Sequence, residues 1–172
     1  MAGAWLCTHL WEHYLYTGDE KFLKNVWPLM KGSAQFMLHW LIKDNSSDYL
    51  ITNPSTSPEN TMKINGKEYQ VGMATTMDMS IIRELFTAVI KTSSILKTDE
   101  VFRNQVMQAK EKLYPFHIGQ YAQLQEWSKD WDDPNDKHRH LSHLFGLYPG
   151  SQITYLTPEM EMAARASVDR HK

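Results

Sequence analysis

The sequence predicts an all-α fold in which antiparallel helix pairs are joined by long loops. Apolar residues recur at three- and four-residue spacing over 2–16, 28–43 and 77–96, which is the period of amphipathic helices. Segments rich in Asn, Ser and Pro separate these stretches and are typical of loops. Six Trp and eight Tyr among 172 residues are common both in large helical cores and in carbohydrate-binding sites, so the aromatic content alone does not choose between them.

Three helices are expected in the first part of the chain. The helix over 2–16 ends before Gly18, which suits a left-handed cap, and Asp19 is expected to cap the next helix. Proline cannot sit deep inside a helix without a kink. We therefore expect a break in the three residues before Pro28 and a new helix over 28–43, with Ile42 on its apolar face.

Residues 44–75 differ in character from the helices on either side. Tyr49–Thr52 is a candidate short strand, and Asn65-Gly66 inside 63–69 is a strong hairpin signal. Long loops between the helices of a compact domain are uncommon and are often functional. Two further helices are expected over 77–96 and over 100–113, the second capped by Asp99, and loops are expected over 114–137. A short helix over 140–147 follows, and a last helix runs from Thr157-Pro158 to Lys172, where no stop signal follows.

Composition excludes several classes of function. The net charge is −2 and no long basic stripe occurs, so nucleic acid is not an expected partner. The single cysteine, Cys7, rules out a disulfide framework and is expected to be a buried, inert thiol. No apolar run reaches the roughly 18 residues of a membrane-spanning helix, and the N-terminus lacks the basic region of a signal peptide.

The segment Asn53–Asn60 is the first candidate for chemistry. Its two prolines stiffen a loop between helices, so Glu59 is held at a defined point. A carboxyl group in that setting can act as a general acid if its surroundings raise its pKa. The alternative is that Glu59 is exposed to solvent and only caps a turn.

Three histidines and one arginine form the second candidate, at His138–His143. The three imidazoles could bind a metal ion, although no accompanying acid motif occurs, and we expect neither a metal nor a cofactor. Arg139 and His140 could instead donate to and accept from sugar hydroxyls. A third interpretation is that His143 is buried among the helices with its hydrogen bonds satisfied.

Trp11 and Glu12 are a third candidate, because an indole can stack on a sugar ring and a carboxylate can accept its hydroxyl bonds. The alternative is a core tryptophan beside a surface glutamate, and the same choice applies to Gln125-Glu126-Trp127. The aspartates of 130–136 lack the glycine and the distal glutamate of a calcium loop, so a solvated acidic loop is expected there.

Taken together, these stretches resemble glycoside hydrolase family 95. The resemblance is carried by the following motifs: Gly3-Ala4-Trp5-Leu6, Leu10–Tyr14, Asn53–Asn60, Ile81–Phe86, Gln125-Glu126-Trp127 and His138–Gly150. It implies an (α/α)6 barrel, a toroid of six helical hairpins, of which this chain could build about half. It also implies inverting hydrolysis of terminal α-L-fucosides, notably fucose 1,2-linked to galactose, with related activity on L-galactosides in some members.

The resemblance also assigns roles to particular residues. Glu59 matches the general acid, and Arg139 and His140 match residues that contact fucose. Trp11 and Glu12 are further substrate-binding candidates. In an inverting enzyme a second group activates a water about 6.5–9.5 Å away, on the other face of the sugar.

This chain departs from the family pattern at its two ends. The family activates water with asparagines upstream of the Gly-Ala-Trp-Leu helix and with an aspartate downstream of the His-Arg-His motif, and neither motif occurs here. We therefore expect residues 1–172 to be a single, incomplete fragment of a catalytic domain that is inactive alone and needs the missing flanking segments of the same enzyme as partners.

The expected ligand is a fucosylated oligosaccharide or glycan. The alternative function is a non-catalytic glycan-binding or interaction module derived from the same fold, in which Glu59 donates no proton. The sequence leaves the location of the protein open, and the resemblance suggests a periplasmic or secreted enzyme.

Overall fold

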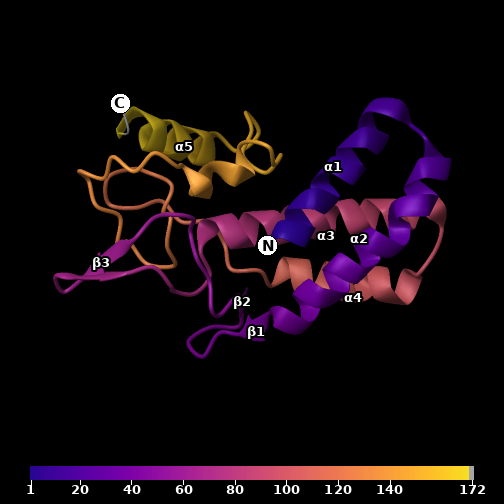
Figure 1. Cartoon of the computed structure of the whole chain (residues 1–172), viewed down its shortest axis with the longest axis horizontal. Coiled ribbons are helices and arrows are strands. Elements are labelled where there is room, and N and C mark those ends of the chain that lie inside the picture. Colours follow the sequence, from indigo (N-terminus) through magenta and orange to yellow (C-terminus); the bar gives the residue numbers. More distant parts are fainter. Residues whose placement is uncertain (171–172) are drawn as a thin grey trace. The chain divides into compact units, whose positions relative to one another are not determined.

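The computed structural model describes residues 1–170, which are mostly helical, as predicted (Figure 1). The described elements follow this order: α1 Ala2–Thr17, α2 Glu20–Trp40, β1 Ile42–Lys43, β2 Leu50–Ile51, β3 Met62–Ile64, β4 Lys67–Tyr69, α3 Thr76–Leu96, α4 Glu100–Glu111, the 3-10 helix η1 Ser142–Gly146 and α5 Pro158–Arg170. The chain forms two compact units. The helical unit comprises Met1–Leu50 and Ile81–Leu113, and the loop-rich unit comprises Ile51–Ser80 and the residues from Tyr114 onward.

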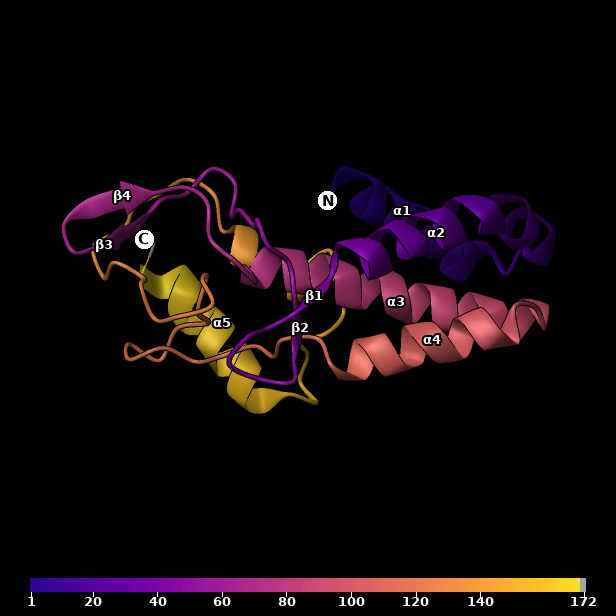
Figure 2. The ribbon, with the colours of Figure 1, turned by 90° about the horizontal axis from the view of Figure 1, so that it is seen from below.

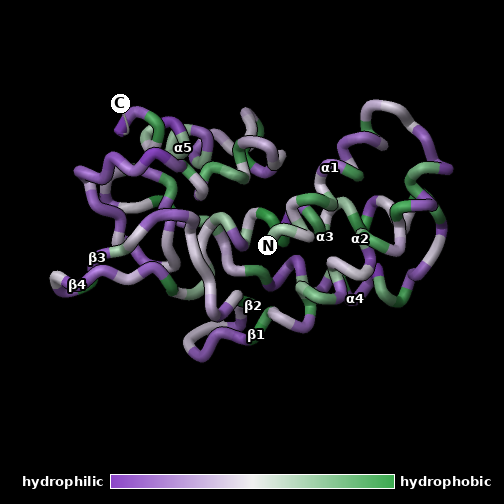
Figure 3. Tube along the Cα trace, viewed as in Figure 1, coloured by the Kyte–Doolittle hydropathy of each residue, from purple (hydrophilic) through white to green (hydrophobic). Residues whose placement is uncertain are grey.

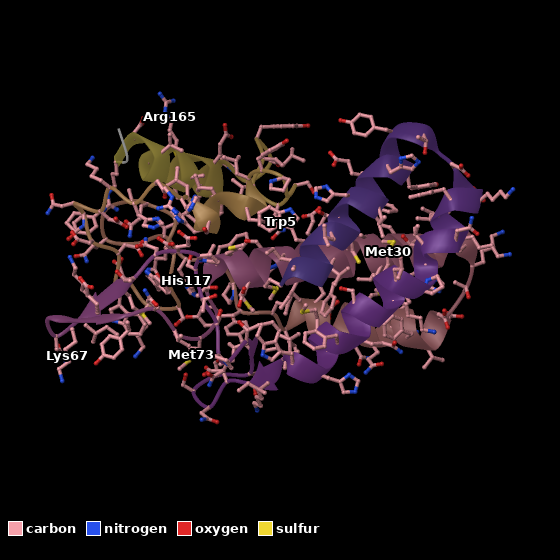
Figure 4. The ribbon with its side chains drawn as sticks, in the orientation of Figure 1. Trp5, Met30, Lys67, Met73, His117 and Arg165 are labelled. Atoms are coloured by element: carbon pink, nitrogen blue, oxygen red, sulfur yellow. The ribbon has the colours of Figure 1, made fainter. Side chains whose placement is uncertain are left out.

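Amphipathic helices build the helical unit. Helix α1 packs against α2, α2 contacts α4, and α3 runs alongside α4 in both views of the ribbon (Figures 1 and 2). Met30, labelled in Figure 4, is fully buried on α2, and Phe86 is fully buried on α3. Local signals placed the helix ends correctly: Gly18 has φ +66° after α1, and the Asp19 carboxylate accepts a hydrogen bond from the Phe22 amide at 2.9 Å.

The predicted break before Pro28 is wrong, because α2 runs unbroken from Glu20 to Trp40. Pro28 and Lys24 are both exposed, so water can solvate the Lys24 carbonyl that receives no helical hydrogen bond from the proline. The buried stripe on the other side of the helix continues past Pro28 and holds both halves against the core. The helix also ends earlier than predicted, and Ile42 is exposed on β1.

Asp99 does not cap α4 as predicted. It precedes the helix with φ +53°, and its side chain makes no capping hydrogen bond. Its carboxylate instead accepts hydrogen bonds from Trp27 Nε1 at 2.8 Å and Lys31 Nζ at 2.7 Å. The Asp99 side chain therefore ties α4 to α2 through these two donors, one of which is the charged Lys31 ammonium.

Short strands and loops make up most of the loop-rich unit. The predicted hairpin is confirmed: β3 and β4 pair antiparallel, and Asn65 and Gly66 at its turn both have positive φ. The hydropathy colouring shows this hairpin as largely hydrophilic (Figure 3), and Lys67 lies exposed near its tip (Figure 4). The core of the unit contains the following buried residues: Leu124, Leu144, Ile153, Ala163 and Ala164.

The later elements agree with the sequence in position. The candidate strand at Tyr49–Thr52 is confirmed as β2, and the predicted short helix after His140 is η1. The last helix begins at Pro158 as predicted, whereas its predicted end at Lys172 lies outside the described residues. No helix within residues 1–170 has the length and apolar character needed to cross a lipid bilayer.

Candidate active site

The structure brings Glu59, Arg139 and His140 together in the loop-rich unit. Arg139 donates from Nη2 to Glu59 Oε2 at 2.5 Å, and His140 Nε2 lies 3.9 Å from the same oxygen. The Glu59 side chain is 65% exposed, so this cluster forms an open polar surface. A carboxyl group next to a guanidinium and an imidazole can exchange a proton and bind sugar hydroxyls.

Trp11 and Glu12 lie on α1 in the helical unit. Trp11 is 7% exposed and its ring centroid lies 5.4 Å from that of Tyr14, as expected of a core tryptophan. Glu12 is exposed, and its carboxylate lies 4.0 Å from His9 Nδ1.

The loop that carries Glu59, here called the acid loop (Asn53–Asn60), is anchored first at the N-terminal end of α3. Asp78, in the first turn of α3, accepts hydrogen bonds from Ser55 Oγ at 2.6 Å and Thr52 Oγ1 at 3.3 Å. Thr75 donates its backbone N–H to Ser55 Oγ at 3.1 Å and its hydroxyl to the Thr56 carbonyl at 3.0 Å. The start of the acid loop is therefore bonded to the end of a helix.

A second buried carboxylate anchors the acid loop around Glu59 itself. Ser57 Oγ donates to Glu126 Oε1 at 2.6 Å, and Asn60 Nδ2 donates to Glu126 Oε2 at 2.9 Å. Asn60 Nδ2 also donates to Asp136 Oδ2 at 2.8 Å. His143 is buried, and its Nδ1 lies 3.6 Å from Glu126 Oε2.

At Gln125-Glu126-Trp127 one of the two interpretations made Glu126 a surface residue, and the structure shows that it is buried. Its side chain accepts from residues 66 and 69 positions earlier, so no local pattern around Gln125-Glu126-Trp127 could reveal the burial. The acidic loop of 130–136 is likewise less solvated than expected. Asp132 accepts from Gln123 Nε2 at 2.9 Å and from the Glu126 amide at 3.3 Å.

Burial changes the protonation of three of these carboxyl groups. It raises the pKa of Glu126 to about 7, although the hydrogen bonds from Ser57 and Asn60 oppose part of the rise. Burial likewise raises the pKa values of Asp78 and Asp132 to about 6 each, against opposing hydrogen bonds from Ser55 and Gln123. The loop-rich unit therefore holds protons at a pH where the unfolded chain has released them.

We expect these groups to lower the stability of the protein as the pH rises. A raised carboxyl pKa favours the folded state fully below the unfolded pKa of about 4, and this contribution is lost as the pH passes through the folded pKa. For Glu126 the loss between pH 5 and pH 8 is at most about 3 kcal/mol, because about two pKa units lie between pH 5 and its folded pKa of about 7, at about 1.4 kcal/mol per unit. Urea unfolding at pH 5 and pH 8 measures it. The decrease is expected to be smaller in Glu126→Gln, and equal decreases in the two proteins would contradict the assignment.

A small cavity lies beside the buried carboxylates. Asn60, Glu126, Asp132 and His143 are among the residues that line it, and its volume of about 20 Å³ suits a buried water. A sugar ring cannot fit in that space. Glu59, Arg139 and His140 are not among the residues that line this cavity.

The three histidines of the sequence cluster have different surroundings. His138 Nδ1 accepts a hydrogen bond from the His140 amide at 3.2 Å, whereas His143 faces Glu126 in the interior. Burial of His143 agrees with one of the interpretations open at the sequence level. Within residues 1–170, no group of three or more His, Cys, Asp and Glu side chains is arranged to hold a metal ion. Cys7 is buried, and burial raises the pKa of its thiol.

Comparison with known proteins places this chain in a family. A model described as the glycosyl hydrolase family 95 catalytic domain matches residues 1–172. Alpha-L-fucosidase 2 of Arabidopsis thaliana is 46% identical over 175 residues, covering 99% of this chain and 20% of that protein. The probable alpha-fucosidase A of Aspergillus niger is 36% identical over 156 residues, covering 88% of this chain and 19% of that protein.

A further relative is similar over a shorter stretch. The kojibiose hydrolase of Flavobacterium johnsoniae is 34% identical over 65 residues, which are 37% of this chain and 10% of that protein. The chain spans about one fifth of the length of the two fucosidases.

Proposed function

The chain belongs to glycosyl hydrolase family 95, and on that premise we propose that it is part of an enzyme that hydrolyses terminal α-L-fucosides with Glu59 as general acid. The observation that supports this proposal is that Glu59, Arg139 and His140 lie together on one open surface, although Glu59 and Arg139 are 80 positions apart in the sequence. The names of the fucosidase relatives agree with the proposed substrate class.

In the proposed reaction Glu59 donates its proton to the glycosidic oxygen. The bond between that oxygen and the anomeric carbon of fucose breaks, and the galactose leaves as a neutral alcohol. A water attacks the opposite face of the sugar and gives its own proton to a base, so the configuration at the anomeric carbon is inverted. The family resemblance assigns water activation to asparagines and an aspartate whose motifs are absent from these 172 residues.

Arg139 and His140 are proposed to bind the sugar. Arg139 offers several fixed N–H donors to fucose hydroxyls, and His140 offers one donor and one acceptor. Both side chains are exposed beside Glu59, as recognition of a ligand from solvent requires. Trp11 and Glu12 are proposed as further sugar contacts, and the exposed Glu12 is the more accessible of the two.

One observation favours the alternative of a non-catalytic glycan-binding module. A general acid acts best from a dry environment, whereas the Glu59 side chain is 65% exposed and ion-paired with Arg139. In that alternative, Glu59 and Arg139 would bind sugar hydroxyls together and no bond would break.

Release of L-fucose from 2′-fucosyllactose separates the two functions. We expect no release by the 172-residue chain and ready release by an enzyme of the relatives' length that contains it. Proton NMR of the first product should show β-L-fucose, the inverted anomer. Binding of the oligosaccharide without release by the longer protein would support the glycan-binding module, and early α-L-fucose would contradict inversion.

A further inference from the structure

We propose that Glu126 is a positioning residue that fixes the part of the acid loop carrying Glu59. The inference rests on the proposed function only where it concerns catalysis. Glu126 does not touch Glu59. It binds the residues on both sides of it, Ser57 two positions before and Asn60 one position after.

The bonds around Glu59 leave the acid loop little freedom at this point. Each Glu126 oxygen accepts from a different loop residue, and the Asn60 amide group also donates to Asp136. The Asn60 backbone N–H donates to the Ser57 carbonyl at 2.7 Å, which closes a turn around Glu59. The Ser142 hydroxyl also donates to the Pro58 carbonyl.

Glu126 is itself held in place, so it can act as an anchor. Its side chain is buried, its carbonyl accepts from the Thr76 amide at 3.0 Å at the start of α3, and its own amide donates to Asp132 at 3.3 Å. Removal of the Glu126 carboxylate would take away the acceptor of Ser57 Oγ and one of the two acceptors of Asn60 Nδ2, and the acid loop would have to move to satisfy these buried donors.

A carboxylate in the helical unit provides a matched control. Asp99 also accepts two side-chain hydrogen bonds, from Trp27 and Lys31. Asp99→Leu therefore removes two side-chain hydrogen bonds, as Glu126→Leu does, and is also expected to destabilise the protein, in part because leucine rarely adopts the φ of +53° found at this position. A loss of activity caused by destabilisation alone appears in both variants, whereas a loss caused by a displaced Glu59 appears only in Glu126→Leu.

Two fucosides with different leaving groups provide the readout. The galactose of 2′-fucosyllactose leaves only when its oxygen receives a proton. The dinitrophenolate of a dinitrophenyl fucoside is a much better leaving group and departs readily without one. In the enzyme that contains this chain, we expect Glu126→Leu to lower kcat on 2′-fucosyllactose about 10²-fold, the loss that follows misplacement by about 1 Å. Its kcat on dinitrophenyl fucoside should change little. Glu126→Gln, which can still accept from Asn60 and bond to Ser57, should restore most of the activity.

The result that would overturn the proposal is an equal loss on the two substrates in Glu126→Leu, or no loss on either. An additivity test adds a second criterion. If Glu126 acts through Ser57, then Ser57→Ala combined with Glu126→Leu should lose no more activity than Glu126→Leu alone. If the two losses of activity add in full, the proposal that Glu126 acts through Ser57 is contradicted.

Amide hydrogen exchange in the 172-residue chain decides the matter if the wild-type enzyme releases no fucose from either substrate. Inactivity of the wild-type enzyme would contradict the proposed function, and hydrogen exchange would then test separately whether Glu126 anchors the acid loop. We expect Asn60 and Thr61 to exchange faster in Glu126→Leu than in Asp99→Leu. Equal exchange in the two variants would overturn the anchoring role itself.

Discussion

Replacement of Glu59 by glutamine is expected to slow the release of fucose from 2′-fucosyllactose about 10²–10⁴-fold, the usual contribution of a general acid. Glutamine keeps the size of the side chain and can still bond to Arg139, but it has no proton to donate. Binding of the oligosaccharide should therefore persist. Steady-state kinetics and calorimetric titration of the complete enzyme measure the two quantities separately.

Glu68→Gln is the matched control, because Glu68 is an exposed glutamate on β4. We expect it to leave the rate unchanged. A Glu59→Gln enzyme that releases fucose as fast as the wild type would show that the proton comes from another group. Loss of binding together with the rate would indicate that Glu59 acts as a sugar ligand instead.

Truncation of Phe86 to alanine should have the largest effect on stability. Phe86 is fully buried on α3, and a buried Phe→Ala substitution typically costs about 3–5 kcal/mol because apolar contacts are lost and a cavity remains. Urea unfolding should show a lower midpoint with an unchanged slope. Val101→Ala is the control, since Val101 on α4 is 86% exposed and should change the stability very little. A small effect of Phe86→Ala would mean that α3 is not central to the core.

The sequence predicted those features of the fold that depend on neighbouring residues. Gly18 marked the end of α1 and Asn65-Gly66 marked the hairpin, because a left-handed backbone is a local requirement. The period of apolar residues similarly placed α3 within one residue of its observed start. The break at Pro28 was predicted wrongly because burial on the opposite face of α2, a tertiary effect, outweighed the local preference.

The candidate site was predictable only in part. Motifs indicated Glu59, Arg139 and His140, and the structure brings these three together. Spacing could not indicate the burial of Glu126, since its partners are far away in the sequence. The capping role of Asp99 was predicted wrongly for the same reason. The two donors that bind its carboxylate lie 68 and 72 positions earlier in the sequence.

The bonds that hold the acid loop also bear on the order in which the protein folds. Its contacts with Asp78, Glu126 and Arg139 join residues that are 23 to 80 positions apart, whereas each helix closes through bonds four residues apart. Closing a long stretch of chain has an entropic cost that must be met before such contacts can form. We therefore expect the helices to form first and the acid loop to reach its final place late. During synthesis, Arg139 must therefore emerge from the ribosome before the surface around Glu59 can assemble.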